Sequence, residues 1–135
     1  MKAIKTIFAG VVLIVLVSVS AIAGTGSKVI AVINKADWCP TCQKNGERAM
    51  TAFMATNKDM AVQFLANDVT NEETKLKSAE ELKKVGLDKA IAAYPGTGVA
   101  YFFNSETKEL INQVSVAKPD AELAAALITA KKGLK

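Results

Sequence analysis

The two cysteines of the chain stand three residues apart, in the string Trp-Cys-Pro-Thr-Cys at residues 38–42, and their surroundings limit the folds that are possible. Five successive apolar residues, Val29 to Ile33, precede the string and predict a strand buried on both faces. The segment from Pro40 to Asn57 has apolar residues at three- and four-residue spacing and predicts a helix. The cysteine pair therefore stands where a buried strand gives way to a helix.

This position gives the first cysteine a distinct chemistry. The start of a helix offers unpaired N–H groups and the positive end of the helix dipole, and both stabilise a thiolate, so we expect a lowered pKa at Cys39. A Cys39 thiolate can attack a disulfide of a partner, and Cys42, about one helical turn later, can then release that partner. Pro40 suits the first turn, where no N–H is needed, and Thr41 completes the spacer.

Three other uses of the pair are weaker. A structural disulfide closing so short a loop adds only about 2 kcal/mol of stability. Two thiolates leave a zinc ion short of ligands in a chain with 0 His, and Gln43 stands where haem attachment requires His. We therefore predict no metal and no cofactor, and favour a redox-active pair.

The rest of the chain predicts one α/β domain. Further strands are expected at 62–66, 99–103 and 110–116, with helices at about 70–86 and 119–133 and a short helical turn at 88–93. The order β-α-β-α-β-β-α gives a central mixed four-stranded sheet flanked by helices: a parallel pair joined by a crossover, then an antiparallel hairpin. Several apolar residues of the three helices are predicted to face the core: Ala49, Met50, Phe53, Met54, Leu76, Ala79, Leu82, Leu123, Leu127, Ile128 and Leu134.

The first 23 residues have the pattern of a signal peptide. Lys2 and Lys5 precede the uncharged run Ile7–Val19, and Ala21-Ile22-Ala23 provides a cleavage site. We expect removal of residues 1–23, which leaves 24–135 as one domain in the periplasm or another extracytoplasmic compartment. The alternative is an uncleaved leader that anchors the protein in the membrane.

Charge excludes one class of partner. Without the two leader lysines, 15 basic residues face 13 acidic ones, since the whole chain has 17 and 13. So small a surplus gives no basic patch for nucleic acid.

The chain resembles the thioredoxin family from about Lys28 to the C-terminus, because the Trp-Cys-x-x-Cys string opens a helix after an apolar strand and a strand hairpin and helix close the chain. The resemblance implies a dithiol–disulfide oxidoreductase, with Cys39 attacking and Cys42 resolving. It also implies protein thiols or disulfides as partners, among them a membrane or soluble redox partner that resets the pair. We expect Trp38, next to Cys39, at the rim of the partner-binding surface.

Three positions depart from the family pattern. Ile33 stands where thioredoxins have a buried Asp, and Ala66 where they have a Lys, so proton transfer from Cys42 would go through water. The family's cis-proline facing the disulfide aligns with Gly98, which follows Thr97. Either Gly98 faces the disulfide or Pro95 does so from a longer loop, and we expect Gly98.

Two further hypotheses remain beside the oxidoreductase. One is a catalytically weak binding module or adaptor of the same fold, which the three departures favour. The other is a metal carrier that uses the two thiolates. The sequence leaves the direction of electron flow and the oligomeric state open.

Overall fold

The computed structural model describes residues 27–133. The expected signal peptide, the anchor alternative and the predicted core residue Leu134 lie outside these residues. Among residues 27–133, no helix is long and apolar enough to cross a membrane.

The described chain follows the predicted order of strands and helices. Its elements are β1 (Val29–Lys35), α2 (Pro40–Thr56), β2 (Val62–Asp68), α3 (Glu72–Lys84), the 3-10 turn η1 (Ile91–Ala93), β3 (Val99–Asn104), β4 (Leu110–Ser115) and α4 (Asp120–Lys132). Helix α2 begins at Pro40, as expected of a residue that lacks an N–H. Helix α4 has Asp120 and Glu122 in its first turn and Lys131 and Lys132 in its last, which complements the helix dipole.

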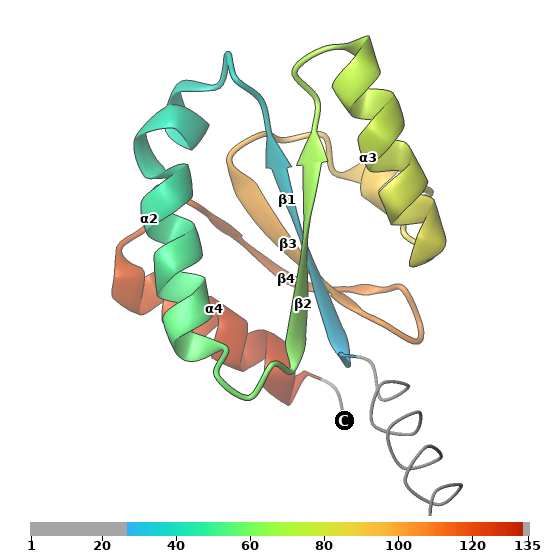
Figure 1. Ribbon diagram of the computed structural model, residues 1–135. Helices are drawn as coiled ribbons and strands as arrows, with labels where there is room; N and C mark the ends of the chain where they lie inside the picture. Colours follow the sequence, from blue (N-terminus) through green and yellow to red (C-terminus); the bar gives the residue numbers. More distant parts are fainter. Residues whose placement is uncertain (1–26, 134–135) are drawn as a thin grey trace, which may run out of the picture.

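The sheet has the mixed topology predicted from the sequence. Its strand order is β2-β1-β3-β4, in which β1 pairs in parallel with β2 and antiparallel with β3, and β3 pairs antiparallel with β4. Strand β1 is therefore central, and its carboxyl end delivers the chain to the cysteine pair at the start of α2 (Figure 1).

Helices cover both faces of this sheet, with α2 and α4 on one side and α3 on the other (Figure 1). The core on the α2 and α4 side contains Val29, Ala31, Ala49, Phe53, Val62, Ala100, Phe102, Val116, Leu123, Leu127 and Ala130. The core on the α3 side contains Ile30, Val32, Leu82, Leu87, Ile91, Tyr101 and Phe103. Because β1 contributes to both cores, its continuous apolar run is explained.

Some predicted core residues are exposed. Met54 is 51% exposed and Ile128 43% exposed, whereas Met50 is partly buried. Strand β2 is the edge of the sheet, so the last turns of α2 have no strand beyond it to cover, and Met54 lines an open groove there.

Helix α3 also departs from the prediction. Leu76 is 67% exposed, Ala79 is exposed, and Ser78 is buried instead. The helix begins slightly later than the predicted 70, because Asn71 caps it and exchanges hydrogen bonds with Thr74 in a capping box. The Ser78 hydroxyl accepts a hydrogen bond of 2.9 Å from the Asp68 N–H, so a polar contact occupies the face that Leu76 was predicted to share.

Two neighbouring residues of α2, one buried and one exposed, should contribute differently to stability. Phe53 is 0% exposed and lies edge-on to Phe102 with ring centroids 5.9 Å apart. We expect Phe53→Ala to lower the free energy of unfolding by about 3–5 kcal/mol, because it removes a buried ring and leaves a cavity. Met54→Ala is the control and should cost less than about 1 kcal/mol. Urea unfolding of both variants checks this, and equal losses would contradict the described packing.

Candidate functional site

Cys39 is the N-cap residue of α2. Its backbone is extended, with φ −86° and ψ 110°, and its sulfur accepts a hydrogen bond of 3.3 Å from the Cys42 N–H. A sulfur thus occupies the place usually taken by a Ser or Asp oxygen, at the positive end of the helix dipole. Pro40 follows as the first helical residue, so the local sequence sets both the helix start and the orientation of Cys39.

The second sulfur lies directly against the first. Both cysteines are free thiols, and Cys42 Sγ is 2.6 Å from Cys39 Sγ. Burial raises the pKa of Cys39, but hydrogen bonds from Cys42 and from the Thr97 side chain, together with helix-start N–H groups, outweigh it and lower the pKa. Burial, the hydrogen bond to Cys39 and the charge of Cys39 raise the pKa of Cys42. Cys39 is therefore the more acidic thiol of the pair.

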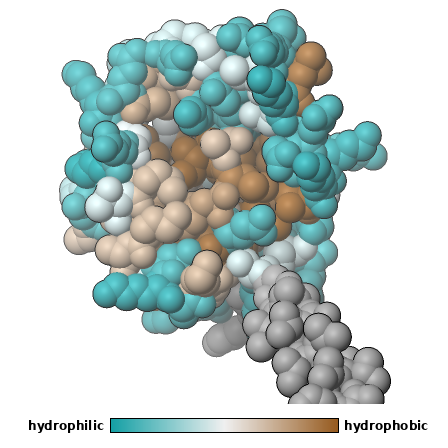
Figure 2. All heavy atoms as spheres, viewed as in Figure 1, coloured by the Kyte–Doolittle hydropathy of each residue, from teal (hydrophilic) through white to brown (hydrophobic). Residues whose placement is uncertain are grey.

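The more acidic thiol is the less accessible one. Cys39 is 4% exposed, whereas Cys42 is half-buried and lines a groove of about 1140 Å³. The groove runs between α2 and the edge strand β2, and Figure 2 shows apolar surface gathered on this face. Ile33 and Ala66 are paired in register on β1 and β2 and both line it, so no carboxylate or lysine from these two positions faces Cys42.

The 94–98 loop lies over the cysteines through its last two residues. A Cβ built on Gly98 would lie 2.9 Å from Thr41 Cγ2 and 3.6 Å from Cys39 Sγ, and the φ of Gly98 is +73°. The Thr97 side chain is among the groups that lower the pKa of Cys39. Pro95 lines a second, smaller groove of about 440 Å³ together with Trp38 and Thr97. The structure thus places Gly98, rather than Pro95, against the sulfurs.

Trp38 lies at the surface beside this second groove and is 59% exposed. Its indole N–H donates to the Thr70 carbonyl at 3.1 Å, and the Thr70 hydroxyl accepts from the Asp37 N–H at 2.9 Å. The loop before α2 is therefore fastened to the loop after β2. Thr70 is itself held by Asp68, with 2.6 Å between the hydroxyl and the carboxylate.

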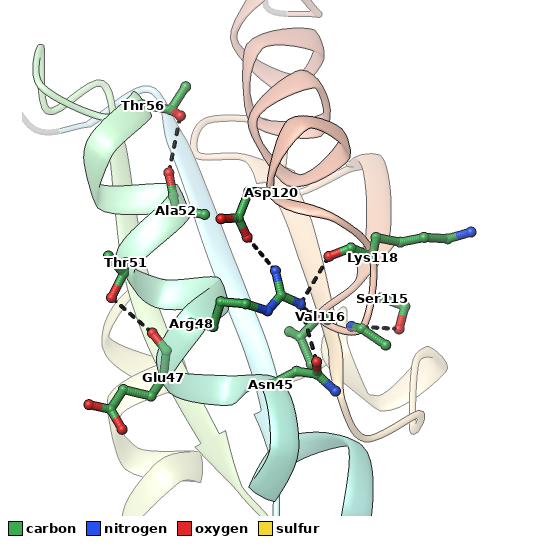
Figure 3. Close-up of polar contacts among 11 residues, drawn as sticks. Asn45, Glu47, Arg48, Thr51, Ala52, Thr56, Ser115, Val116, Lys118 and Asp120 are labelled. Carbon is green, nitrogen blue, oxygen red and sulfur yellow. Dashed lines mark hydrogen bonds and ion pairs between the residues drawn. The ribbon is translucent and has the colours of Figure 1, made fainter.

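Arg48 holds α2 against the segment between β4 and α4 (Figure 3). Its guanidinium pairs with Asp120 and donates to the carbonyls of Val116 at 2.9 Å and Lys118 at 3.0 Å. The Val116 N–H in turn donates to the Gly98 carbonyl at 2.9 Å. The helix that bears the cysteines and the loop that covers them are thus connected through Val116.

Sequence reasoning missed this supporting set. The sequence pattern predicts no role for Arg48 or Asn34, and none for Thr70 as an anchor for Trp38. One signal was present: Asn34 is a polar residue at the end of an otherwise apolar strand, and it is 1% exposed. Such a residue needs hydrogen-bond partners inside the protein, and these define a position next to the site.

The described chain offers few ligands for a metal ion. No group of three or more His, Cys, Asp or Glu side chains that could hold a metal ion occurs within residues 27–133. The two sulfurs would be the ligands available to a metal at this site.

Comparison with known proteins gives a limited result. No family model and no curated protein match the chain. Among solved structures, the crystal structure of Trxlp from Edwardsiella tarda EIB202 is similar, with a TM-score of 0.48 and 16% sequence identity over 82% of this chain and 91% of that chain. The element order, the strand order and the cysteine pair at the start of α2 give this chain a thioredoxin-like fold.

The hydrogen bond from Thr97 leads to a prediction about Cys39. Thr97→Val keeps the side-chain shape and removes the hydroxyl, so the pKa of Cys39 should rise. At a pH below that pKa, alkylation of Cys39 should slow about fivefold, the equivalent of a net hydrogen bond of about 1 kcal/mol. Thr51→Val is the matched control, because the Thr51 hydroxyl donates only within α2, to Glu47. An unchanged alkylation rate in Thr97→Val would show that the hydroxyl does not stabilise the thiolate.

Two glycines allow a paired test of the close approach at the site. Gly98→Ala should lower the free energy of unfolding by about 1–3 kcal/mol, because the φ is positive and the new methyl group would meet Thr41. Gly46→Ala should raise it by about 0.5–1 kcal/mol, because Gly46 is helical and a Cβ there meets nothing within 4 Å. Urea unfolding measures both, and a neutral Gly98→Ala would contradict the described loop.

Proposed function

We propose that the protein is a thiol–disulfide oxidoreductase that exchanges electrons between its Cys39–Cys42 pair and protein partners. The Cys39 thiolate attacks a partner disulfide, that S–S bond breaks, and one partner sulfur leaves as a thiolate. Cys42 then loses its proton and attacks Cys39 Sγ, which releases the second partner sulfur. The two partner sulfurs take up two protons from water, which has received those of Cys39 and Cys42, so the partner has gained two electrons and two protons as a dithiol. Cys39 and Cys42 are then joined by a disulfide. The reverse sequence oxidises a partner.

One observation carries this proposal: Cys39 caps α2 with its sulfur, and a second thiol lies 2.6 Å away. The helix start and the Thr97 hydrogen bond favour the thiolate of Cys39, which is the nucleophilic form. The less acidic Cys42 is suited to act second, after the first exchange has joined Cys39 to the partner.

Acidity and exposure favour different cysteines for the attack. Cys39 has the lower pKa but is buried, and Cys42 is open to the groove along β2. We assign the attack to Cys39, because the thiolate fraction determines reactivity. Gly98 lies close to the Cys39 sulfur, so movement of the 94–98 loop would give a partner access to it.

The proton of Cys42 needs an acceptor other than a buried carboxylate. Ile33 and Ala66 line the groove with Cys42, and the groove opens to solvent. Water in the groove can accept the proton, as the sequence departures at these two positions led us to expect.

The proposed compartment and partners follow from the sequence. The leader pattern at residues 1–23 favours an extracytoplasmic location, where protein disulfides form and persist. The partners would be protein thiols or disulfides, with a further redox partner that resets the pair. Trp38, the residue before Cys39, and the groove it shares with Pro95 and Thr97 offer a surface for such a partner.

Trapping of the mixed disulfide tests the roles of the two cysteines. Cys42→Ser should form a stable mixed disulfide at Cys39 with a peptide that contains a disulfide, whose second sulfur leaves as a thiolate, whereas Cys39→Ser should lose more than about 99% of insulin-reducing activity because no acidic thiol remains. Mass spectrometry of the adducts and the insulin assay measure this. Adducts on Cys42 of Cys39→Ser, with none on Cys39 of Cys42→Ser, would reverse the roles.

The direction of electron flow is measured on the same protein. Trp38 fluorescence, followed across a series of reduced and oxidised glutathione ratios with alkylation as a thiol count, gives the midpoint of a two-electron transition. No exchange at any ratio would favour the binding-module hypothesis. Protection of both thiols from alkylation by one Zn²⁺ or Cu⁺ per chain would favour the metal carrier.

A further inference from the structure

The carboxyl end of β1 contains a buried amide that is directed at the loop over the cysteines. Asn34 is 1% exposed and is the residue before the last in β1. It pairs in register with Asn67 on β2 and Val99 on β3. Its neighbours on the same face of β1, Ile30 and Val32, are apolar core residues. A buried amide among such residues requires specific hydrogen-bond partners.

Asn34 contacts the 94–98 loop at both of its ends. The side-chain Nδ2 donates to the Tyr94 carbonyl at 2.7 Å, and the backbone carbonyl accepts from the Gly98 N–H at 2.8 Å. The side-chain Oδ1 accepts from Asn67 Nδ2 at 3.0 Å, which fixes the orientation of the amide. One residue of a rigid strand therefore determines where this five-residue loop begins and ends.

Other contacts on the loop are weaker or lie elsewhere. The Tyr101 hydroxyl reaches the Gly96 carbonyl at 3.4 Å, and the Gly98 carbonyl accepts from Val116 at 2.9 Å. The Asn34 amide thus makes the short side-chain hydrogen bond at the start of the loop, at Tyr94, three residues before Thr97. The same residue also borders the pair directly, since Cys42 Sγ lies 4.0 Å from the Asn34 carbonyl oxygen.

We propose that Asn34 is a positioning residue for the cysteine pair, which holds the 94–98 loop so that Gly98 lies against Cys39 Sγ and its neighbour Thr97 stays close to the pair. The proposal deepens the proposed function and rests on it. Asn34 makes no hydrogen bond to the attacking sulfur; it acts through the loop that carries Thr97 and Gly98. The polar residue that ends the apolar run of β1 is therefore used to set the reactivity of Cys39.

The test compares Asn34→Ala with the matched variant Asn57→Ala. Asn57 is also a buried amide with two backbone partners, because its side chain donates to the Val62 carbonyl at 2.7 Å and accepts from the Val62 N–H at 3.1 Å. It lies at the far end of α2, a helix of 17 residues and hence about 25 Å long. Both variants should lose stability, whereas Asn34→Ala alone should change Cys39.

The readout is the rate of Cys39 alkylation across pH in the Cys42→Ser background, where Cys39 is the single thiol. Cys42 is the titratable group in contact with Cys39, and its removal leaves a single titration. Asn34→Ala should slow alkylation at a pH below the midpoint roughly two- to fivefold and shift the midpoint upward, because the Thr97 hydrogen bond is misplaced. Asn57→Ala should leave both unchanged.

A double-mutant cycle identifies the route. If Asn34 acts through Thr97, the effect of Asn34→Ala should largely disappear in a Thr97→Val background. Additive effects, an unchanged midpoint in folded Asn34→Ala, or an equal shift in Asn57→Ala would each overturn the proposal. Should Asn34→Ala fail to fold, Asn34→Ser is used, since its hydroxyl is one atom too short to replace Nδ2 at Tyr94 but leaves less empty space.

This experiment is separable from the proposed function. The alkylation rate depends on the Cys39 thiolate and requires no disulfide exchange. A wild-type protein that fails to exchange with glutathione would remove the oxidoreductase proposal. The Asn34 result would still show whether this residue positions the loop.

Discussion

The structure of the site depends on one interaction, the capping of α2 by the Cys39 sulfur. The N–H groups at the start of a helix have no partners within the helix, so some acceptor must be supplied from outside it. Here the acceptor is a sulfur, and the Cys42 N–H donates to it at 3.3 Å. One contact therefore both satisfies an N–H group at the start of α2 and stabilises the Cys39 thiolate. The helix start also brings the second thiol to 2.6 Å from the first.

The elements around this contact hold it in place from three directions. Thr70, in the loop after β2, accepts a hydrogen bond from Trp38 in the loop before α2. Arg48 connects α2 to the segment before α4, and Asn34 holds the 94–98 loop. Each of these contacts joins parts of the chain at least 32 residues apart, which is the separation of Trp38 and Thr70. The reactive pair is local in sequence, but its surroundings are assembled by the tertiary structure.

The open side of the site lies along the edge strand. Since β2 has no neighbouring strand beyond it within the described chain, α2 overhangs the sheet, and Met54 and Ile33 line a groove that reaches Cys42. This arrangement explains two departures from expectation together. Met54 is exposed although its spacing predicted burial, and Cys42 is more accessible than Cys39 although it is the thiol assigned to act second.

The sequence by itself determined the element order, the parallel first pair of strands, the closing hairpin and the position of the cysteine pair, because apolar periodicity and Pro40 are local signals. It did not determine that β3 pairs with β1. It did not determine which helix residues are buried, as Met54, Leu76 and Ile128 show, because burial depends on which neighbour lies opposite each face. The resemblance led us to expect Gly98 near the disulfide, but only the tertiary structure showed that the loop is held there by Asn34. These contacts span strands and loops that periodicity does not relate, so the acidity of Cys39 is set jointly by a local helix start and by distant residues.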